Sequence, residues 1–108
     1  MQRGDIVTVA GRGDFASKPR PALIVQSDQF CSAHSSFTVL PLTSQPAEPV
    51  MFRVSILANS DTGLQQNSSI MVDKLQSVRR DRIGAVLGRA DLPTMHRVEE
   101  ALRLWLAL

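Results

Sequence analysis

The chain has 108 residues, 44% of them apolar, which suffices for one hydrophobic core, and we expect a single domain over residues 1–108. Arginine carries nearly all the positive charge behind the formal net charge of +2, since only Lys18 and Lys74 are lysines, and its planar fork suits phosphate or carboxylate partners. One cysteine and two histidines exclude an internal disulfide and argue against a zinc site, so we expect no metal and no other cofactor.

Nothing in the sequence indicates export or membrane insertion. Residues 1–5 lack the apolar core of a secretory signal, and the longest apolar stretch, residues 104–108, is too short to span a bilayer. The tripeptide Arg-Gly-Asp occurs at residues 3–5 and 12–14, where turn formation explains it better than cell adhesion. We therefore expect a cytoplasmic protein.

The first half of the chain alternates apolar runs with turn signals, as in a small barrel or sandwich. Residues 6–9 form the first predicted strand, and the loop 11–19 holds two glycines and a proline. The nearly continuous apolar run 22–25 predicts a strand covered on both faces. A polar loop, 26–36, leads to the third predicted strand, 37–42.

Strands continue in the second half until the apolar period changes. Strands are predicted at residues 51–56, 69–75 and 83–88, with a turn cluster at 59–63. From Asp91 apolar residues recur at spacings of three and four, which predicts a C-terminal amphipathic helix. Strands followed by a terminal helix indicate a mostly β or α+β domain.

The predicted helix has a start signal and an apolar face. Asp91 is the expected N-cap, and Pro93 falls in the first turn, where proline is tolerated. The expected apolar face consists of Leu92, Met95, Val98, Leu102 and Trp105.

Two prolines set a guanidinium and a hydroxyl at corresponding ends of consecutive strands. Arg20 precedes Pro21 at the start of the second strand, and Thr43 follows Pro41 at the end of the third. Pro41 cannot donate to a ladder, so we expect it at a strand edge or bulge that redirects Thr43. Arg20 can reach two phosphate oxygens, and Thr43 can hydrogen-bond a phosphate or orient an attacking hydroxyl. The pair therefore indicates phosphate chemistry.

A proton acceptor for such chemistry is less clearly marked. Neither a guanidinium nor an alcohol is a convincing general base for internal attack on a phosphodiester. Asp73 can accept the proton if it faces the site; otherwise it is a structural carboxylate pairing with Lys74 or a nearby arginine. His34 belongs to the side-chain type that titrates near neutral pH, but a solvated loop histidine is the competing interpretation.

Some basic and aromatic residues suggest contact with RNA. The cluster of Arg79, Arg80 and Arg82 can follow an RNA backbone or form a solvated hairpin tip. Phe15, beside the first loop, is the candidate for stacking on a base. The other aromatic residues are expected in the core, or at an interface in the last case: Phe30, Phe37, Phe52 and Trp105.

Several segments, in order and spacing over essentially the whole chain, match one family. They are Arg3-Gly4-Asp5-Ile6-Val7, Arg20-Pro21-Ala22-Leu23-Ile24-Val25, Pro41-Leu42-Thr43-Ser44, Met71-Val72-Asp73-Lys74-Leu75-Gln76-Ser77-Val78 and the closing helix. With these segments the chain resembles the MazF/PemK (Kid) toxins of type II toxin–antitoxin systems. The Arg-Pro and Pro-x-Thr motifs are the most specific parts of the resemblance.

The resemblance implies a small SH3-like barrel with a terminal helix, assembled as a homodimer. It implies a metal-independent endoribonuclease that cuts single-stranded RNA, expected to be messenger RNA, to 2′,3′-cyclic phosphate and 5′-hydroxyl ends. A cognate antitoxin would block the RNA-binding surface with its flexible tail. The implied catalytic residues are Arg20 and Thr43. Further candidates for catalysis or RNA binding are Asp73, Ser44, Phe15, Lys18, Gln76, Arg79 and Arg80.

The chain departs from the PemK/Kid branch and lies nearer the MazF branch. Met71 stands where the PemK/Kid branch carries an arginine, and the first loop lacks that branch's histidine. Two other functions remain open. One is a CcdB-like DNA gyrase poison, ranked lower because Trp105 precedes Leu-Ala-Leu and lies on the apolar helical face. The other is a non-catalytic SH3-like binding module, in which Arg20 and Thr43 would be incidental.

Overall fold

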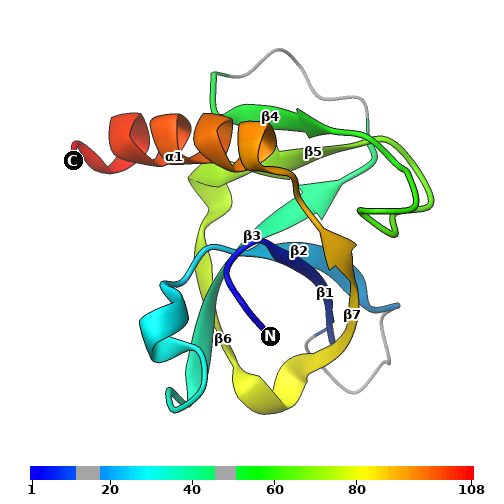
Figure 1. Ribbon diagram of the computed structural model, residues 1–108, viewed down its shortest axis with the longest axis vertical. Helices are drawn as coiled ribbons and strands as arrows, with labels where there is room; N and C mark the ends of the chain where they lie inside the picture. Colours follow the sequence, from blue (N-terminus) through cyan, green and yellow to red (C-terminus); the bar gives the residue numbers. More distant parts are fainter. Residues whose placement is uncertain (12–17, 46–50) are drawn as a thin grey trace.

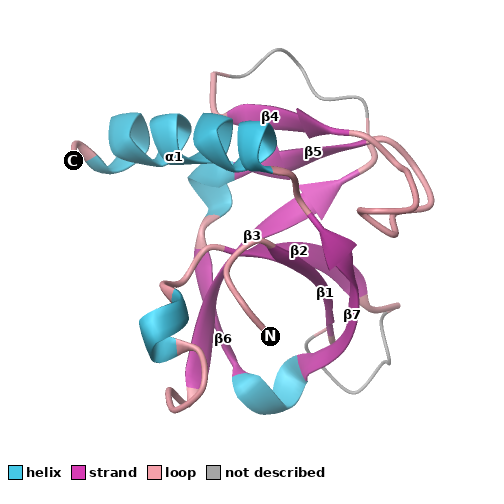
Figure 2. Ribbon diagram, viewed as in Figure 1, coloured by secondary structure: helices cyan, strands magenta, loops and turns pink. Residues whose placement is uncertain are grey.

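The described part of the chain is an antiparallel sheet that carries one C-terminal helix (Figure 1). The computed structural model describes residues 1–11, 18–45 and 51–108. Its strands are β1 (Asp5–Val9), β2 (Arg20–Ile24), β3 (Ser36–Thr43), β4 (Arg53–Ile56), β5 (Ser68–Met71), β6 (Gln76–Arg79) and β7 (Ile83–Arg89). The helix is α1 (Leu92–Leu106), and the short 3₁₀ turns are η1 (Asp28–Phe30), η2 (Val72–Lys74) and η3 (Arg80–Arg82) (Figure 2). The predicted α+β class is confirmed; the SH3-like barrel stays a prediction of the resemblance.

Strand β3 is the central strand of this sheet. Among the described residues the order is β4-β5-β3-β2-β1-β7, and β6 also pairs with β3. One edge of β3 pairs with β2; the other pairs with β6 over residues 36–39 and with β5 over residues 42–43. Pro41 lies between these two ladders, inside a long strand rather than at the expected outer edge or bulge. A residue without an N–H is tolerated there because neither β5 nor β6 pairs with it.

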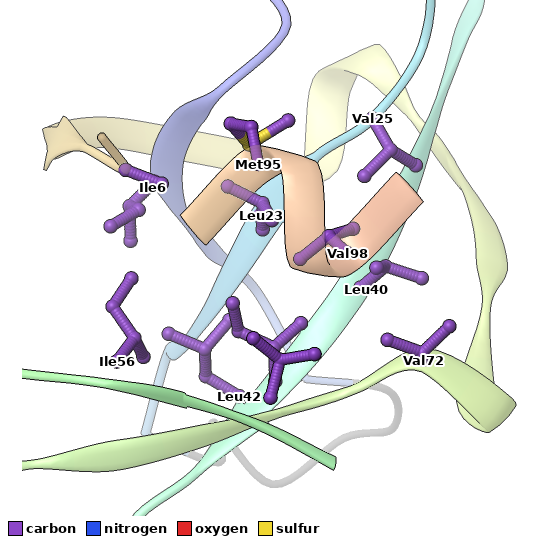
Figure 3. Close-up of a cluster of buried hydrophobic side chains, with 12 residues drawn as sticks. Ile6, Leu23, Val25, Leu40, Leu42, Ile56, Val72, Met95 and Val98 are labelled. Atoms are coloured by element: carbon purple, nitrogen blue, oxygen red, sulfur yellow. The ribbon is translucent and has the colours of Figure 1, made fainter. Parts of the chain in front are cut away.

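The core explains why β2 reads as a continuous apolar run. Leu23 belongs to a cluster between the sheet and α1, whereas Ala22 and Ile24 belong to a second cluster on the opposite face. The strand is therefore covered on both faces, as predicted. Figure 3 shows the first cluster, whose buried residues include Ile6, Leu23, Leu40, Val72, Met95 and Val98. The helix contributes Met95 and Val98 to it.

The predicted helix and its cap are confirmed. Asp91 accepts a hydrogen bond from the Thr94 N–H at 2.8 Å, and hydrogen bonds from Thr94 lower the pKa of Asp91. Met95 and Val98 are buried, but Leu92 is 73% exposed because it is the first helical residue and precedes the turn that packs on the sheet. No helix in residues 1–11, 18–45 or 51–108 has the length and apolarity to cross a bilayer.

The strand predicted at residues 69–75 is wrong in its second half. β5 ends at Met71, η2 follows, and a separate strand, β6, begins at Gln76. The turn moves the chain from one end of β3 to the other, and fully buried Val72 donates its N–H to the Phe52 carbonyl at 3.0 Å. An apolar run can thus combine strand and turn when the turn also points into the core.

The aromatic side chains divide between core and surface. Phe37 is fully buried, as expected, and partly buried Phe52 packs edge-on against Trp105 with ring centroids 5.0 Å apart. Phe30 is 53% exposed, contrary to expectation, because it ends η1 on a surface loop. Trp105 keeps an exposed fraction of 46% despite the ring contact.

Candidate functional site

The structure brings Arg20 and Thr43 together on neighbouring strands. In the β2–β3 ladder Ala22 stands opposite Pro41 and Leu23 opposite Leu40. Continuing that antiparallel register by two residues places Arg20 opposite Thr43. Arg20 is exposed and Thr43 is half-buried. The two side chains that the sequence analysis paired therefore lie at the same end of one strand pair.

Two surface hollows meet at this strand pair. The first has a volume of about 290 Å³ and the second about 400 Å³. Both are lined by the same four residues: Arg20, Pro21, Leu42 and Thr43. The first hollow continues over Val9, Met71, Gln76, Val78 and Arg82. The second continues over Lys18, Ser44, Gln45, Gln65, Gln66 and Ser68.

Local hydrogen bonding leaves both central side chains available to a ligand. The Thr43 hydroxyl oxygen accepts the Gln45 N–H at 3.2 Å, so its own proton remains free to be donated. The Arg20 guanidinium has no hydrogen-bond or ion-pair partner within the described residues. A fixed hydroxyl and an unpaired guanidinium at one rim form a suitable cradle for a phosphate group.

The two candidate bases lie elsewhere. Asp73, in η2, faces Arg53 of β4, with 3.9 Å between Oδ1 and Nε. His34 is exposed in the loop before β3, where its Nδ1 accepts the Ser36 N–H at 3.2 Å. Neither lines a hollow, and no histidine or carboxylate of the described residues does. The described residues thus supply a charge stabiliser and a hydroxyl at the site, and no general base.

The Asp73–Arg53 pair leads to a stability prediction. Asp73 Oδ1 and Arg53 Nε are both buried without a hydrogen-bond partner among the described residues, although their side chains are 24% and 18% exposed. We expect Asp73→Asn or Arg53→Met alone to lower the free energy of unfolding by about 1 to 2 kcal/mol, because each leaves the other charge unpaired. The double variant Arg53→Met/Asp73→Leu should recover most of that loss in urea titrations. A double variant less stable than either single variant would contradict this account.

The arginine cluster is divided between structural and exposed roles. Arg80 donates to the carbonyls of Cys31 and His34, and its guanidinium carbon lies 4.5 Å from the Phe37 ring centroid. Arg79 is exposed and pairs with Asp81 at 2.9 Å. The third member, Arg82, donates to a loop carbonyl and lines the first hollow. The cluster is therefore not one uniform basic surface.

The remaining predicted residues distribute between the hollows. Lys18 and Ser44 line the second hollow, and Gln76 lines the first. Phe15 lies outside the described residues. Sequence reasoning missed Gln65 and Gln66, which follow a turn cluster and carry no periodic or motif signal. No group of three or more His, Cys, Asp or Glu side chains gathers as a potential metal site within the ranges described.

Comparison with known proteins connects this site to one family. The family model for a PemK-like, MazF-like toxin of a type II toxin–antitoxin system matches residues 2–106. The "Probable endoribonuclease MazF" of Mycolicibacterium smegmatis is 40% identical over 108 residues, covering 100% of this chain and 98% of that protein. "Endoribonuclease MazF9" of Mycobacterium tuberculosis is 31% identical, with the same coverage of 100% and 98%.

Solved structures share the fold at lower identity. An endoribonuclease in complex with its cognate antitoxin from a mycobacterial species superposes with a TM-score of 0.81 at 22% identity, covering 100% of this chain and 96% of that one. MazF from Deinococcus radiodurans gives a TM-score of 0.81 at 20% identity, covering 100% and 97%. The whole described chain therefore has the architecture of these proteins.

Proposed function

The chain belongs to the PemK-like, MazF-like family of toxins of type II toxin–antitoxin systems, and on this basis we propose that it is a cytoplasmic endoribonuclease. Its substrate would be single-stranded RNA, in the cell chiefly messenger RNA. The observation that carries the proposal is the convergence of Arg20 and Thr43 on the rim shared by two hollows. Curated relatives named as endoribonucleases support the same activity.

The proposed reaction is internal transesterification without a metal ion. The ribose 2′-oxygen attacks the adjacent phosphorus, the bond from phosphorus to the 5′-oxygen breaks, and the ends are a 2′,3′-cyclic phosphate and a 5′-hydroxyl. Arg20 would stabilise the charge that develops on the non-bridging oxygens, and Thr43 would hydrogen-bond the phosphate. Both roles act through positioning and charge. No general base is assigned among the described residues.

The proposed partners are an antitoxin and a second copy of the chain. A disordered antitoxin tail would cover the hollows and set its carboxylates against Arg20. Exposed apolar residues at the end of α1, among them Leu104, Trp105 and Leu106, are compatible with a homodimer. The family match and the names of the relatives do not favour the gyrase-poison alternative.

The proposal is tested by exposing a long mixed-sequence single-stranded RNA to the purified protein in EDTA and mapping the new ends. We expect cuts at a restricted set of sequences, with 5′-hydroxyl ends that polynucleotide kinase can label directly. The upstream fragments should carry the cyclic phosphate at their 3′ ends. RNA left intact at protein concentrations that arrest growth would exclude the proposed activity.

A further inference from the structure

The two hollows differ in chemistry although they share one rim. From this difference we infer that each hollow takes one of the two nucleosides flanking the cut bond, and that the second hollow reads its base through the side-chain amides of Gln65 and Gln66. The inference rests on the proposed endoribonuclease function. It assigns specificity to a loop that no sequence motif marks.

The shared rim fixes the position of the scissile phosphate between the hollows. Arg20 and Thr43 line both hollows, so a phosphate held by them would lie where the two hollows adjoin. In single-stranded RNA the nucleosides attached to one phosphate are its immediate neighbours, so their bases have the two hollows within reach. Unstacked bases of this kind are the usual objects of sequence-specific RNA recognition.

The second hollow has the groups that read base edges. Gln65 and Gln66 are exposed, and neither side-chain amide has a hydrogen-bond partner within the described residues. Each amide offers donors and an acceptor, the combination that matches the adjacent polar atoms of a base edge. Ser68 adds a hydroxyl, and Lys18 adds a positive charge for the sugar–phosphate backbone.

The loop that carries these glutamines is held in place. Asn67 accepts the Ala58 N–H at 2.8 Å, and the Thr62 hydroxyl donates to the Leu57 carbonyl at 2.9 Å. Gly63 has φ +66°, and a Cβ there would lie 2.0 Å from the Leu87 carbonyl oxygen of β7. Only glycine therefore permits this close approach, which fixes the loop against the sheet. Amides on a fixed loop can discriminate between bases without the entropic cost of ordering that loop on binding.

The first hollow is lined mainly by apolar side chains. Val9, Met71 and Val78 are among the apolar residues that line this hollow and not the second, and Gln76 carries its single side-chain amide among the described residues. The Arg82 guanidinium, which also lines it, already donates to the Ala10 carbonyl. Apolar contact discriminates weakly between bases, whereas unpaired amides penalise a wrong base edge. The second hollow should therefore contribute the sharper preference.

The test compares cleavage-site sequences for matched variants on one long RNA library without divalent metal. Gln65→Ala/Gln66→Ala should lower the preference at one nucleotide flanking the cut by about tenfold, the loss of one good base contact. Gln76→Ala should weaken the preference at the nucleotide on the opposite side of the cut. Gln29→Ala, an exposed glutamine in η1 that lines neither hollow, is the control and should cut like wild type.

The results distinguish failure of the inference about base recognition from failure of the proposed endoribonuclease function. If wild type leaves the library uncut, the proposed function fails. If wild type cuts and the double variant keeps the same cleavage-site sequences, the inference alone fails. It also fails if both sets of variants act on the same side of the cut, or if the double variant slows all cuts uniformly. Thermal unfolding of each variant, expected to match wild type because these side chains are exposed, separates lost recognition from lost folding.

Discussion

Arg20→Ala should reduce the single-turnover rate of RNA cleavage by about 10² to 10³, without lowering thermal stability. The guanidinium lines both hollows and has no hydrogen-bond or ion-pair partner within the described residues, so its removal breaks no such bond among them. What is lost is one preorganised charge at the oxygens that become more negative as the bond breaks, which corresponds to about 3 to 4 kcal/mol. Rates should be measured with excess protein to separate chemistry from binding.

Two further substitutions sharpen the measurement. Arg20→Lys keeps the charge but loses the fork, so its rate should fall between those of wild type and Arg20→Ala. Arg97→Ala removes an exposed arginine of α1 that lines neither hollow, and should cut at the wild-type rate. Wild-type cleavage by Arg20→Ala would instead show that Arg20 is incidental, as in a non-catalytic binding module.

The sequence predicted most of the strands and the helix because the formation of each depends mainly on its own residues. The strands predicted at residues 6–9 and 22–25 correspond to β1 and β2, where β-branched and apolar side chains meet a core, although β2 begins at Arg20 and ends at Ile24. Asp91 caps a helix where its side chain satisfies a free N–H. Arg20 and Thr43 could be paired in advance because a proline marks each strand end. Their opposition follows from one antiparallel register.

The errors arise where tertiary contacts outweigh the local pattern. The sequence of residues 69–75 does not reveal the break between β5 and β6. Val72 has the apolar side chain of a strand residue, but it lies in a 3₁₀ turn and is buried in the core. The position of Pro41 depends on two partner strands, because β6 pairs with β3 before this residue and β5 pairs with β3 after it. Gln65 and Gln66 reach the site only because β4 and β5 return their loop to the β2–β3 end. No residue spacing in the sequence predicts that Gln65 and Gln66 lie near this site.

The arginine cluster shows why a sequence pattern does not fix a residue's role. Arg79 and Arg80 are adjacent and chemically identical, and both were candidates for RNA contact. The structure leaves Arg79 with a side chain 78% exposed, whereas the Arg80 guanidinium is held by carbonyls of the loop before β3. Donors that already bond backbone carbonyls are not free to bind a phosphate. The two neighbours should therefore respond differently to the same substitution.

Arg80→Ala should lower the free energy of unfolding by about 2 to 3 kcal/mol, a fall in melting temperature on the order of 10 °C. The side chain donates to the Cys31 carbonyl and to the His34 carbonyl, the latter from two nitrogens at 2.8 and 3.1 Å, and covers the buried Phe37 ring. Its removal frees the loop carbonyls and uncovers that ring. Denaturant titration and thermal unfolding by circular dichroism measure the loss.

Arg79→Ala is the matched control, because its ion pair with Asp81 joins side chains that are 78% and 64% exposed. An exposed pair of this kind contributes little, so unfolding should change by less than about 0.5 kcal/mol. At a temperature where it stays folded, Arg80→Ala should bind RNA with the same salt dependence as wild type. If it proves as stable as wild type and instead binds RNA with a shallower salt dependence, Arg80 contacts phosphate, and its bonds to the loop carbonyls do not stabilise the fold.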